Sequence, residues 1–124
     1  MPKKILIAED SPTMRSFIVS AIAAMGDFIL VEAANGFDAL RILPREKVDL
    51  VITDINMPDI NGLELVSFIK NNPNYKSTPL FIVSTEGSER DREKGLALGA
   101  DAYLVKPFSP EDLQALVSRF LEQE

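Results

Sequence analysis

Short apolar runs alternate along the chain with stretches in which apolar residues recur every three or four positions. Short runs rich in Val, Ile and Leu are typical of buried β-strands, and the longer recurrence is typical of amphipathic helices. The runs predict five strands, at Lys4–Ala8, Phe28–Ala33, Leu50–Thr53, Leu80–Val83 and Ala102–Val105.

Helix-start residues follow each predicted strand. Ser11 before Pro12 offers an N-cap and a proline at the first helical position. Ser88 with Asp91 three residues later has the spacing of a capping box. Further starts are Asn61-Gly62 and Ser109-Pro110, Asn35-Gly36 marks a turn before a short helix, and expected ends are Gly26, Pro44 and Gly99. The apolar stripes are Met14, Phe17, Ile18, Ala21, Ile22 and Met25; Ala39, Leu40 and Leu43; Leu65, Val66 and Ile69; Leu96 and Leu98; and Leu113, Leu116, Val117, Phe120 and Leu121.

The polar, proline-containing segment Asn71–Pro79 is expected to be a loop. The order is then strand followed by helix, five times. Strands that are apolar on both faces and separated by helices predict an α/β fold, a doubly wound parallel sheet covered on both sides. We expect one domain over residues 1–124, with its functional crevice at the carboxyl ends of the strands.

Composition narrows the chemistry that such a crevice can perform. The 124 residues include no cysteine and no histidine, which excludes disulfides, thiolate chemistry and histidine ligands. The net charge of −6 argues against binding to nucleic acid, whose phosphates it would repel. No apolar run approaches the ~20 residues of a membrane span and the start does not resemble a signal peptide, so we expect a cytoplasmic protein.

Polar residues gather at the predicted strand ends. Glu9 and Asp10 end the first strand, Asp54 the third, Ser84 and Thr85 the fourth, and Lys106 and Pro107 the fifth. Two carboxylates 4 Å apart repel by roughly 4 kcal/mol at an effective dielectric constant of 20. Three carboxylates therefore need a cation or a change of protonation, and oxygen ligands without His or Cys favour Mg²⁺ as the cation. The competing interpretation is that Lys106 alone neutralises them.

Asp54 is the best candidate nucleophile, because a carboxylate can attack phosphorus and form an acyl phosphate. Lys106 and Ser84 could then hold phosphoryl oxygens by charge and by hydrogen bond. The alternative for Asp54 is a turn or helix cap within DINMPDING.

Four segments in this order, ILIAEDS, VITDINMPDINGLEL, FIVST and GADAYLVKPF, resemble the receiver domains of two-component response regulators. The resemblance covers essentially the whole chain and is greatest to the single-domain chemotaxis type, which is CheY-like. It implies a (βα)₅ flavodoxin-like fold with strand order 2-1-3-4-5.

The resemblance also implies residue roles. Asp54 would be the phosphoacceptor, with Lys106 on the phosphoryl group and Ser84 and Tyr103 as the switch pair. Mg²⁺, with Mn²⁺ as a substitute, would be held by Asp10, Asp54, the backbone carbonyl of Asn56 and, through water, Glu9. Asn56 and Glu86 would flank the water that removes the phosphoryl group, within minutes or faster. The Lys106–Pro107 bond would be cis.

Two positions depart from the commonest family pattern: Glu9 replaces Asp, and Ser84 replaces Thr. The longer arm of Glu9 should still reach a metal-bound water. Serine lacks the methyl group that restrains χ1, so coupling between phosphorylation and output is expected to be looser. Thr85 is a second hydroxyl that could contribute.

A histidine kinase would be the phosphodonor, and the chain would catalyse only its own phosphorylation and dephosphorylation. We expect a monomer without a second domain, whose output is docking to a protein through the fourth helix, fifth strand and fifth helix. The segment DSPTMRSF, at the start of the first helix, resembles chemotaxis regulators and suggests a flagellar motor target. The fourth helix is highly charged and holds Gly95, which should weaken it and let it move.

Four other functions compete with this interpretation. A phosphate sink or phosphorelay intermediate outside chemotaxis needs the same site. A haloacid-dehalogenase-like phosphatase would need an Asp where Asn56 stands, and a flavodoxin-like electron carrier would need a phosphate loop where EDSPTMR is acidic. A scaffold that no longer uses phosphate would not need every chemical position filled.

Overall fold

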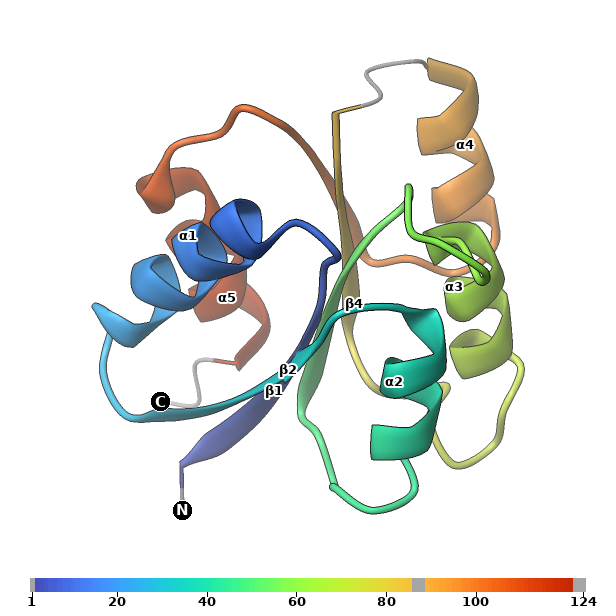
Figure 1. Cartoon of the computed structure of the whole chain (residues 1–124), viewed down its shortest axis with the longest axis horizontal. Helices are drawn as coiled ribbons and strands as arrows, with labels where there is room; N and C mark the ends of the chain where they lie inside the picture. Colours follow the sequence, from blue (N-terminus) through green and yellow to red (C-terminus); the bar gives the residue numbers. More distant parts are fainter. Residues whose placement is uncertain (1, 86–88, 122–124) are drawn as a thin grey trace.

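A single sheet divides the molecule into two helical layers. In the computed structural model, which describes residues 2–85 and 89–121, helices α1 and α5 lie on one side of the sheet and α2, α3 and α4 on the other (Figure 1). The strands are β1 (Lys3–Ala8), β2 (Phe28–Ala33), β3 (Leu50–Asp54), β4 (Leu80–Ser84) and β5 (Ala102–Val105). The helices are α1 (Pro12–Ala23), α2 (Gly36–Ile42), α3 (Gly62–Lys70), α4 (Glu89–Ala97) and α5 (Pro110–Leu121).

All strand pairs are parallel, and the strand order is β2-β1-β3-β4-β5. The predicted fold is therefore confirmed, with strand bounds that differ by at most one residue. Asp54 pairs with Val83, and Ser84 pairs with Val105. The carboxyl ends of β3, β4 and β5 thus lie side by side at one end of the sheet.

The core consists of two apolar clusters, one on each face of the sheet. Leu65, Val66 and Ile69 of α3 join one cluster, and Ile18 and Ile22 of α1 join the other. The central strands β1, β3 and β4 supply residues to both clusters, as buried strands should. Burying both faces of these strands is what makes their sequences continuous apolar runs.

The edge strands are less buried than expected from strands apolar on both faces. In β2, Ile29 and Glu32 are exposed, and in β5, Val105 is exposed. The reason is position: each edge strand has a neighbour on one side only, and the helices cover it incompletely.

Side chains cap several of the helix starts. Ser11 Oγ accepts from the Met14 N–H as expected, and Asn35, expected only in a turn, caps α2 because its Oδ1 accepts from the Asp38 N–H. Asn61 and Glu64 form a reciprocal capping box at α3. Ser88, the expected cap of α4, lies outside the described residues. Helix α1 ends at Ala23 rather than at Gly26, which takes a φ of +148° in the turn beyond it.

Gly95 has a packing role that the sequence did not reveal. It is the buried residue of α4, and a Cβ placed there would lie 2.5 Å from Ile82 Cδ1 on β4. The glycine therefore lets α4 approach the sheet closely. Its presence is explained by this approach, and not only by a need for a weak helix.

Gly95→Ala should destabilise the protein, and a smaller side chain at Ile82 should reduce that loss of stability. The extra methyl gains helix propensity of about 1 kcal/mol, but overpacking costs about 1–3 kcal/mol. In Gly95→Ala/Ile82→Val, the lost Cδ1 makes room for the new methyl. We expect a coupling energy of about 1 kcal/mol in urea unfolding. Ile7→Val, in the cluster on the opposite face, serves as the control and should be additive with Gly95→Ala; additivity of both pairs would contradict the prediction.

No helix among residues 2–85 and 89–121 is both long enough and apolar enough to cross a membrane.

Candidate functional site

Three carboxylates converge where β1 and β3 end. Glu9 and Asp10 follow β1, and Asp54 is the last residue of β3. One carboxylate oxygen from each residue can be chosen so that all lie within 4.8 Å of one another. Glu9 and Asp54 are buried, whereas Asp10 is exposed. The cluster therefore opens to solvent on the side of Asp10.

Lys106 reaches this cluster from the end of β5. Its Nζ lies 2.9 Å from Glu9 Oε1, as a hydrogen-bonded ion pair, and 3.5 Å from Asp54 Oδ1. If all three carboxylates are ionised, one ammonium leaves two negative charges. Lys106 alone then does not neutralise the pocket, and a divalent cation would.

Burial has the largest effect on the pKa of each of the two buried carboxyls, Glu9 and Asp54. Desolvation raises the pKa of Glu9, and the hydrogen bond from Lys106 opposes that rise only in part. Desolvation likewise raises the pKa of Asp54, with the charge of Lys106 as the main opposing effect. The ionised form of each carboxyl is therefore less stable here than in water. A bound cation would stabilise that form.

The donor set fits magnesium. Carboxylate oxygens are the ligands that Mg²⁺ prefers, and an exposed member leaves room for the waters that the ion retains. Asp10 and Asp54 are the residues that would hold the ion directly. Asn56, whose backbone carbonyl is the third predicted ligand, is exposed in the loop after β3.

The position of Asp54 is set by the backbone around it. Its Oδ1 accepts a hydrogen bond from the Ile55 N–H at 2.9 Å. The first residue of α3, Gly62, donates its N–H to the Ile55 carbonyl at 2.8 Å. A Cβ at Gly62 would lie 2.0 Å from the Asp54 carbonyl oxygen. Glycine is required at this position because α3 starts against the backbone that carries the candidate nucleophile.

The two hydroxyls after β4 differ in burial. Ser84 is buried, and its carbonyl accepts the Lys106 N–H at 2.7 Å, while Thr85 is exposed. Ser84 therefore sits beside the Lys106 backbone, at the same edge as Asp54. The Lys106–Pro107 bond is cis, as the resemblance implied.

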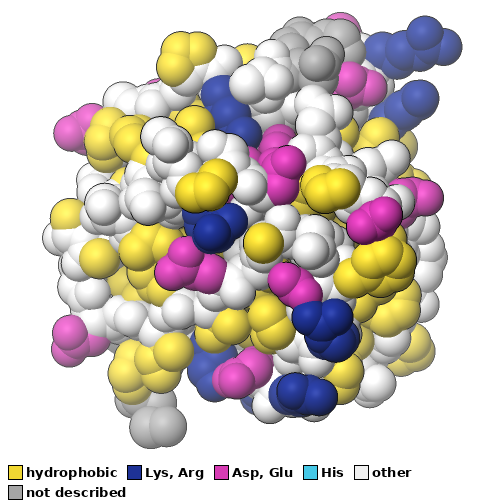
Figure 2. Space-filling model, viewed as in Figure 1, with side chains coloured by type: hydrophobic (Ala, Val, Ile, Leu, Met, Phe, Trp, Pro, Cys, Tyr) yellow, Lys and Arg dark blue, Asp and Glu magenta, His cyan; other side chains and the backbone are white. Residues whose placement is uncertain are grey.

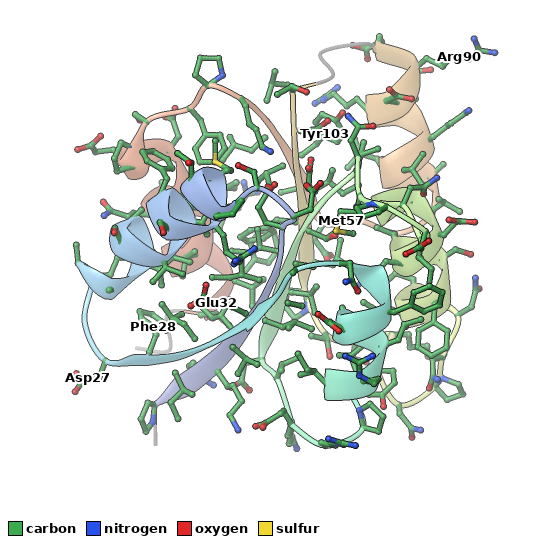
Figure 3. All side chains as sticks on the ribbon, in the orientation of Figure 1. Asp27, Phe28, Glu32, Met57, Arg90 and Tyr103 are labelled. Carbon is green, nitrogen blue, oxygen red and sulfur yellow. The ribbon has the colours of Figure 1, made fainter. Side chains whose placement is uncertain are left out.

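Tyr103 is half-buried on β5 and packs on the sheet face that α4 covers. Its Cδ2 lies 3.8 Å from the place that a Gly95 Cβ would occupy. Figure 3 labels Tyr103 near the carboxyl ends of the strands. The ring is thus placed between α4 and the sheet, and its role as a switch stays a prediction. Glu86, the other predicted residue of the turnover step, lies outside the described residues.

Sequence reasoning missed three residues that build this site. Ser11 donates its backbone N–H to Glu9 Oε2 at 3.1 Å, in addition to capping α1. Gly62 was interpreted only as part of a helix start. Arg15 donates to the Glu9 carbonyl, and no pattern in the sequence marks it.

Residues 5–118 match the family model described as the response regulator receiver domain, so the chain belongs to that family. A chemotaxis protein CheY homolog of Campylobacter jejuni is 38% identical over 112 residues, which are 90% of this chain and 86% of that protein. The structure of the Vibrio cholerae chemotaxis protein CheY4 has a TM-score of 0.90 at 34% identity and covers 98% of this chain and 100% of its own.

One structural neighbour of this chain contains a bound metal ion. The receiver domain of the sensor histidine kinase PA1611 from Pseudomonas aeruginosa carries a magnesium ion coordinated in its active-site cleft. It is 26% identical to this chain, has a TM-score of 0.88 and covers 99% of this chain and 100% of its own. The chain is therefore a CheY-like receiver domain with an acidic cluster that could bind a metal.

Proposed function

We propose that this chain is a phosphorylation-operated switch that accepts a phosphoryl group from a histidine kinase on Asp54, with Mg²⁺ held by Asp10 and Asp54. The observation that carries the proposal is the meeting of three carboxylates within 4.8 Å, two of them in reach of Lys106. Bound there, Mg²⁺ would offset the charge of the carboxylates and of the incoming phosphoryl oxygens.

The transfer step is a displacement at phosphorus. An oxygen of the Asp54 carboxylate attacks the phosphorus, and the bond from phosphorus to the donor imidazole nitrogen breaks. The electron pair of that bond leaves with the imidazole, which then takes a proton from water if it has none. Lys106 moves from Glu9 toward a phosphoryl oxygen, and the Ser84 hydroxyl donates to another. The chain catalyses only its own phosphorylation and dephosphorylation.

Output follows from the neighbours of Lys106 and Ser84. Once Ser84 turns to the phosphoryl group, Tyr103 changes rotamer with it and alters the α4–β5–α5 surface. Leu96, Leu98 and Val105 leave apolar area exposed on α4, on the residues that follow it and on β5, where a protein partner could bind. The chemotaxis relatives favour a motility target over a role as a phosphate sink or relay intermediate.

The surface agrees with a protein partner in preference to nucleic acid. On the face drawn in Figure 2, acidic side chains are interspersed with lysines and arginines. The chain as a whole carries a net charge of −6. An acidic, mixed surface repels phosphate backbones and suits recognition by a protein.

Incubation with acetyl phosphate and Mg²⁺ tests the proposal, with intact mass as the measurement. The wild-type protein should gain one phosphoryl group, and Asp54→Ala or omission of Mg²⁺ should abolish the gain. Asp59→Asn, an exposed carboxylate in the same loop, is the matched control and should still be modified. No adduct under any condition would favour the scaffold interpretation, and an adduct on Asp54→Ala would place the chemistry elsewhere.

A binding experiment tests the output. Flagellar switch proteins should bind the protein more tightly in the presence of Mg²⁺ and beryllofluoride, a phosphoryl mimic, than in its absence. Equal binding in both states would argue against a switch, and no binding in either state would favour a sink or relay role.

A further inference from the structure

Arg15, in the first turns of α1, connects that helix to the ends of two strands. Its Nη1 donates a hydrogen bond of 2.6 Å to the Glu9 carbonyl, and its Nε lies 3.1 Å from Glu32 Oε1 on β2. Figure 3 labels Glu32 on β2, on the side of the sheet that α1 covers. The arginine side chain as a whole is 21% exposed, and its hydrogen bond to the Glu9 carbonyl is partly buried, whereas its contact with Glu32 lies at the surface.

The contact with Glu9 fixes a peptide plane. The Glu9 carbonyl and the Asp10 N–H belong to one planar unit, so holding the carbonyl holds the direction in which Asp10 leaves the backbone. On the other side, the Glu9 N–H donates to the Ala33 carbonyl at 3.0 Å. The backbone at the end of β1 is therefore held from both sides, by β2 and by Arg15.

Asp10 depends on this backbone more than its two partners do. The Glu9 carboxylate accepts from Ser11 and Lys106, and the Asp54 carboxylate accepts from the Ile55 N–H. Within the described part of the chain, the carboxylate of Asp10 accepts no such hydrogen bond, and the side chain is exposed. Its aim toward the cluster is therefore set by its own backbone, which Arg15 holds.

We propose that Arg15 is a positioning residue for the metal site: its hydrogen bond to the Glu9 carbonyl orients Asp10 as a metal ligand. This inference rests on the proposed function, because it concerns the same Mg²⁺ site. Partners that orient the ligands of a metal without touching it typically change its affinity by about 10–100-fold when they are removed.

Charge and positioning predict opposite effects of removing Arg15. The guanidinium is a cation near an acidic cluster, so its loss makes the surroundings more negative, and charge alone would tighten the binding of Mg²⁺. Loss of the hydrogen bond lets the Glu9–Asp10 peptide turn, which would weaken binding. The sign of the change in affinity therefore separates the two effects.

Isothermal titration calorimetry with MgCl₂ tests the inference on Arg15→Met, which removes both the donor and the charge while keeping an unbranched side chain. We expect the dissociation constant to rise by about tenfold. In Arg15→Met/Glu32→Gln the net charge equals that of the wild type, and the weakening should persist. Glu32→Gln alone keeps the bond to Glu9 and should change the constant by less than about twofold.

Stability is measured in parallel by urea unfolding, because a merely structural arginine would lower the unfolding midpoint and leave the affinity of the folded protein unchanged. If Arg15→Met folds poorly, Arg15→Lys, which keeps a donor on a different geometry, should still show weaker binding. Unchanged or tighter binding in the folded variants overturns the inference while the proposed function stands. Absence of Mg²⁺ binding by the wild type overturns both.

Discussion

Replacing Lys106 with methionine should lower the free energy of unfolding by about 3 kcal/mol at pH 7, because the change leaves Glu9 and Asp54 buried without their cation. The Lys106 side chain is 9% exposed, and those of its two partners are 1% and 7% exposed. Solvent therefore cannot replace the lost charge. Lys76→Met, at an exposed lysine, is the matched control and should cost little.

The loss should depend on pH in a defined direction. Burial already raises the pKa values of Glu9 and Asp54 in the folded protein, and Lys106 opposes that rise. Without Lys106 both pKa values rise further. A carboxyl whose folded pKa is raised contributes stability that is fully present below its unfolded pKa, about 4, and is lost as the pH rises through the folded pKa. The deficit of Lys106→Met should thus be large at neutral pH and should shrink toward pH 4.

Urea unfolding across this pH range, in EDTA, measures the effect. Adding Mg²⁺ at pH 7 should recover part of the deficit, because a bound cation restores positive charge beside the carboxylates. A deficit of equal size at pH 4 and pH 7 would mean that lost packing, and not lost charge, is responsible.

Gly62→Ala should lower the free energy of unfolding more than any other single methyl group added at the site. The new Cβ would lie 2.0 Å from the Asp54 carbonyl oxygen and 2.7 Å from Ile55 Cα. Both neighbours are backbone atoms, which cannot turn aside as a side chain can, so α3 and the end of β3 must separate. We expect a loss of about 3 kcal/mol in the free energy of unfolding.

The same displacement should impair chemistry. A misplacement of about 1 Å at a reacting group can cost on the order of 100-fold in rate. The initial rate of adduct formation from acetyl phosphate, measured where the variant is still folded by circular dichroism, should therefore fall steeply. Gly95→Ala is the control, because its new methyl meets the movable end of Ile82; equal rate losses in both variants would contradict the prediction.

The runs KILIA, LVIT and LFIV predicted the central strands well, because a strand buried on both faces must be apolar at every position. The edge strands were predicted equally well in position but not in burial, since the sequence does not mark which strand lacks a neighbour. Helix starts followed from capping residues, whereas the end of α1 did not follow from Gly26.

For the candidate site, the sequence predicted which residues gather but not which of them pair. Parallel strands bring their carboxyl ends to one edge, so the residues after β1, β3, β4 and β5 had to gather there. Which of them would pair was not determined: Lys106 lies closer to Glu9 than to Asp54. Arg15 resembles any charged residue on a solvent-facing helix surface until α1 is packed against β1 and β2.

The amino-acid pattern by itself determined the layers, the strand identities and the edge at which acidic and basic groups meet, because periodicity and chain direction are local properties. Only the tertiary structure decided the close approaches and the partners: glycine at positions 62 and 95, the ammonium on Glu9, and the guanidinium on the Glu9 carbonyl. These depend on the separations between segments remote in sequence, where a small shift decides whether a contact forms, and local patterns do not encode such separations.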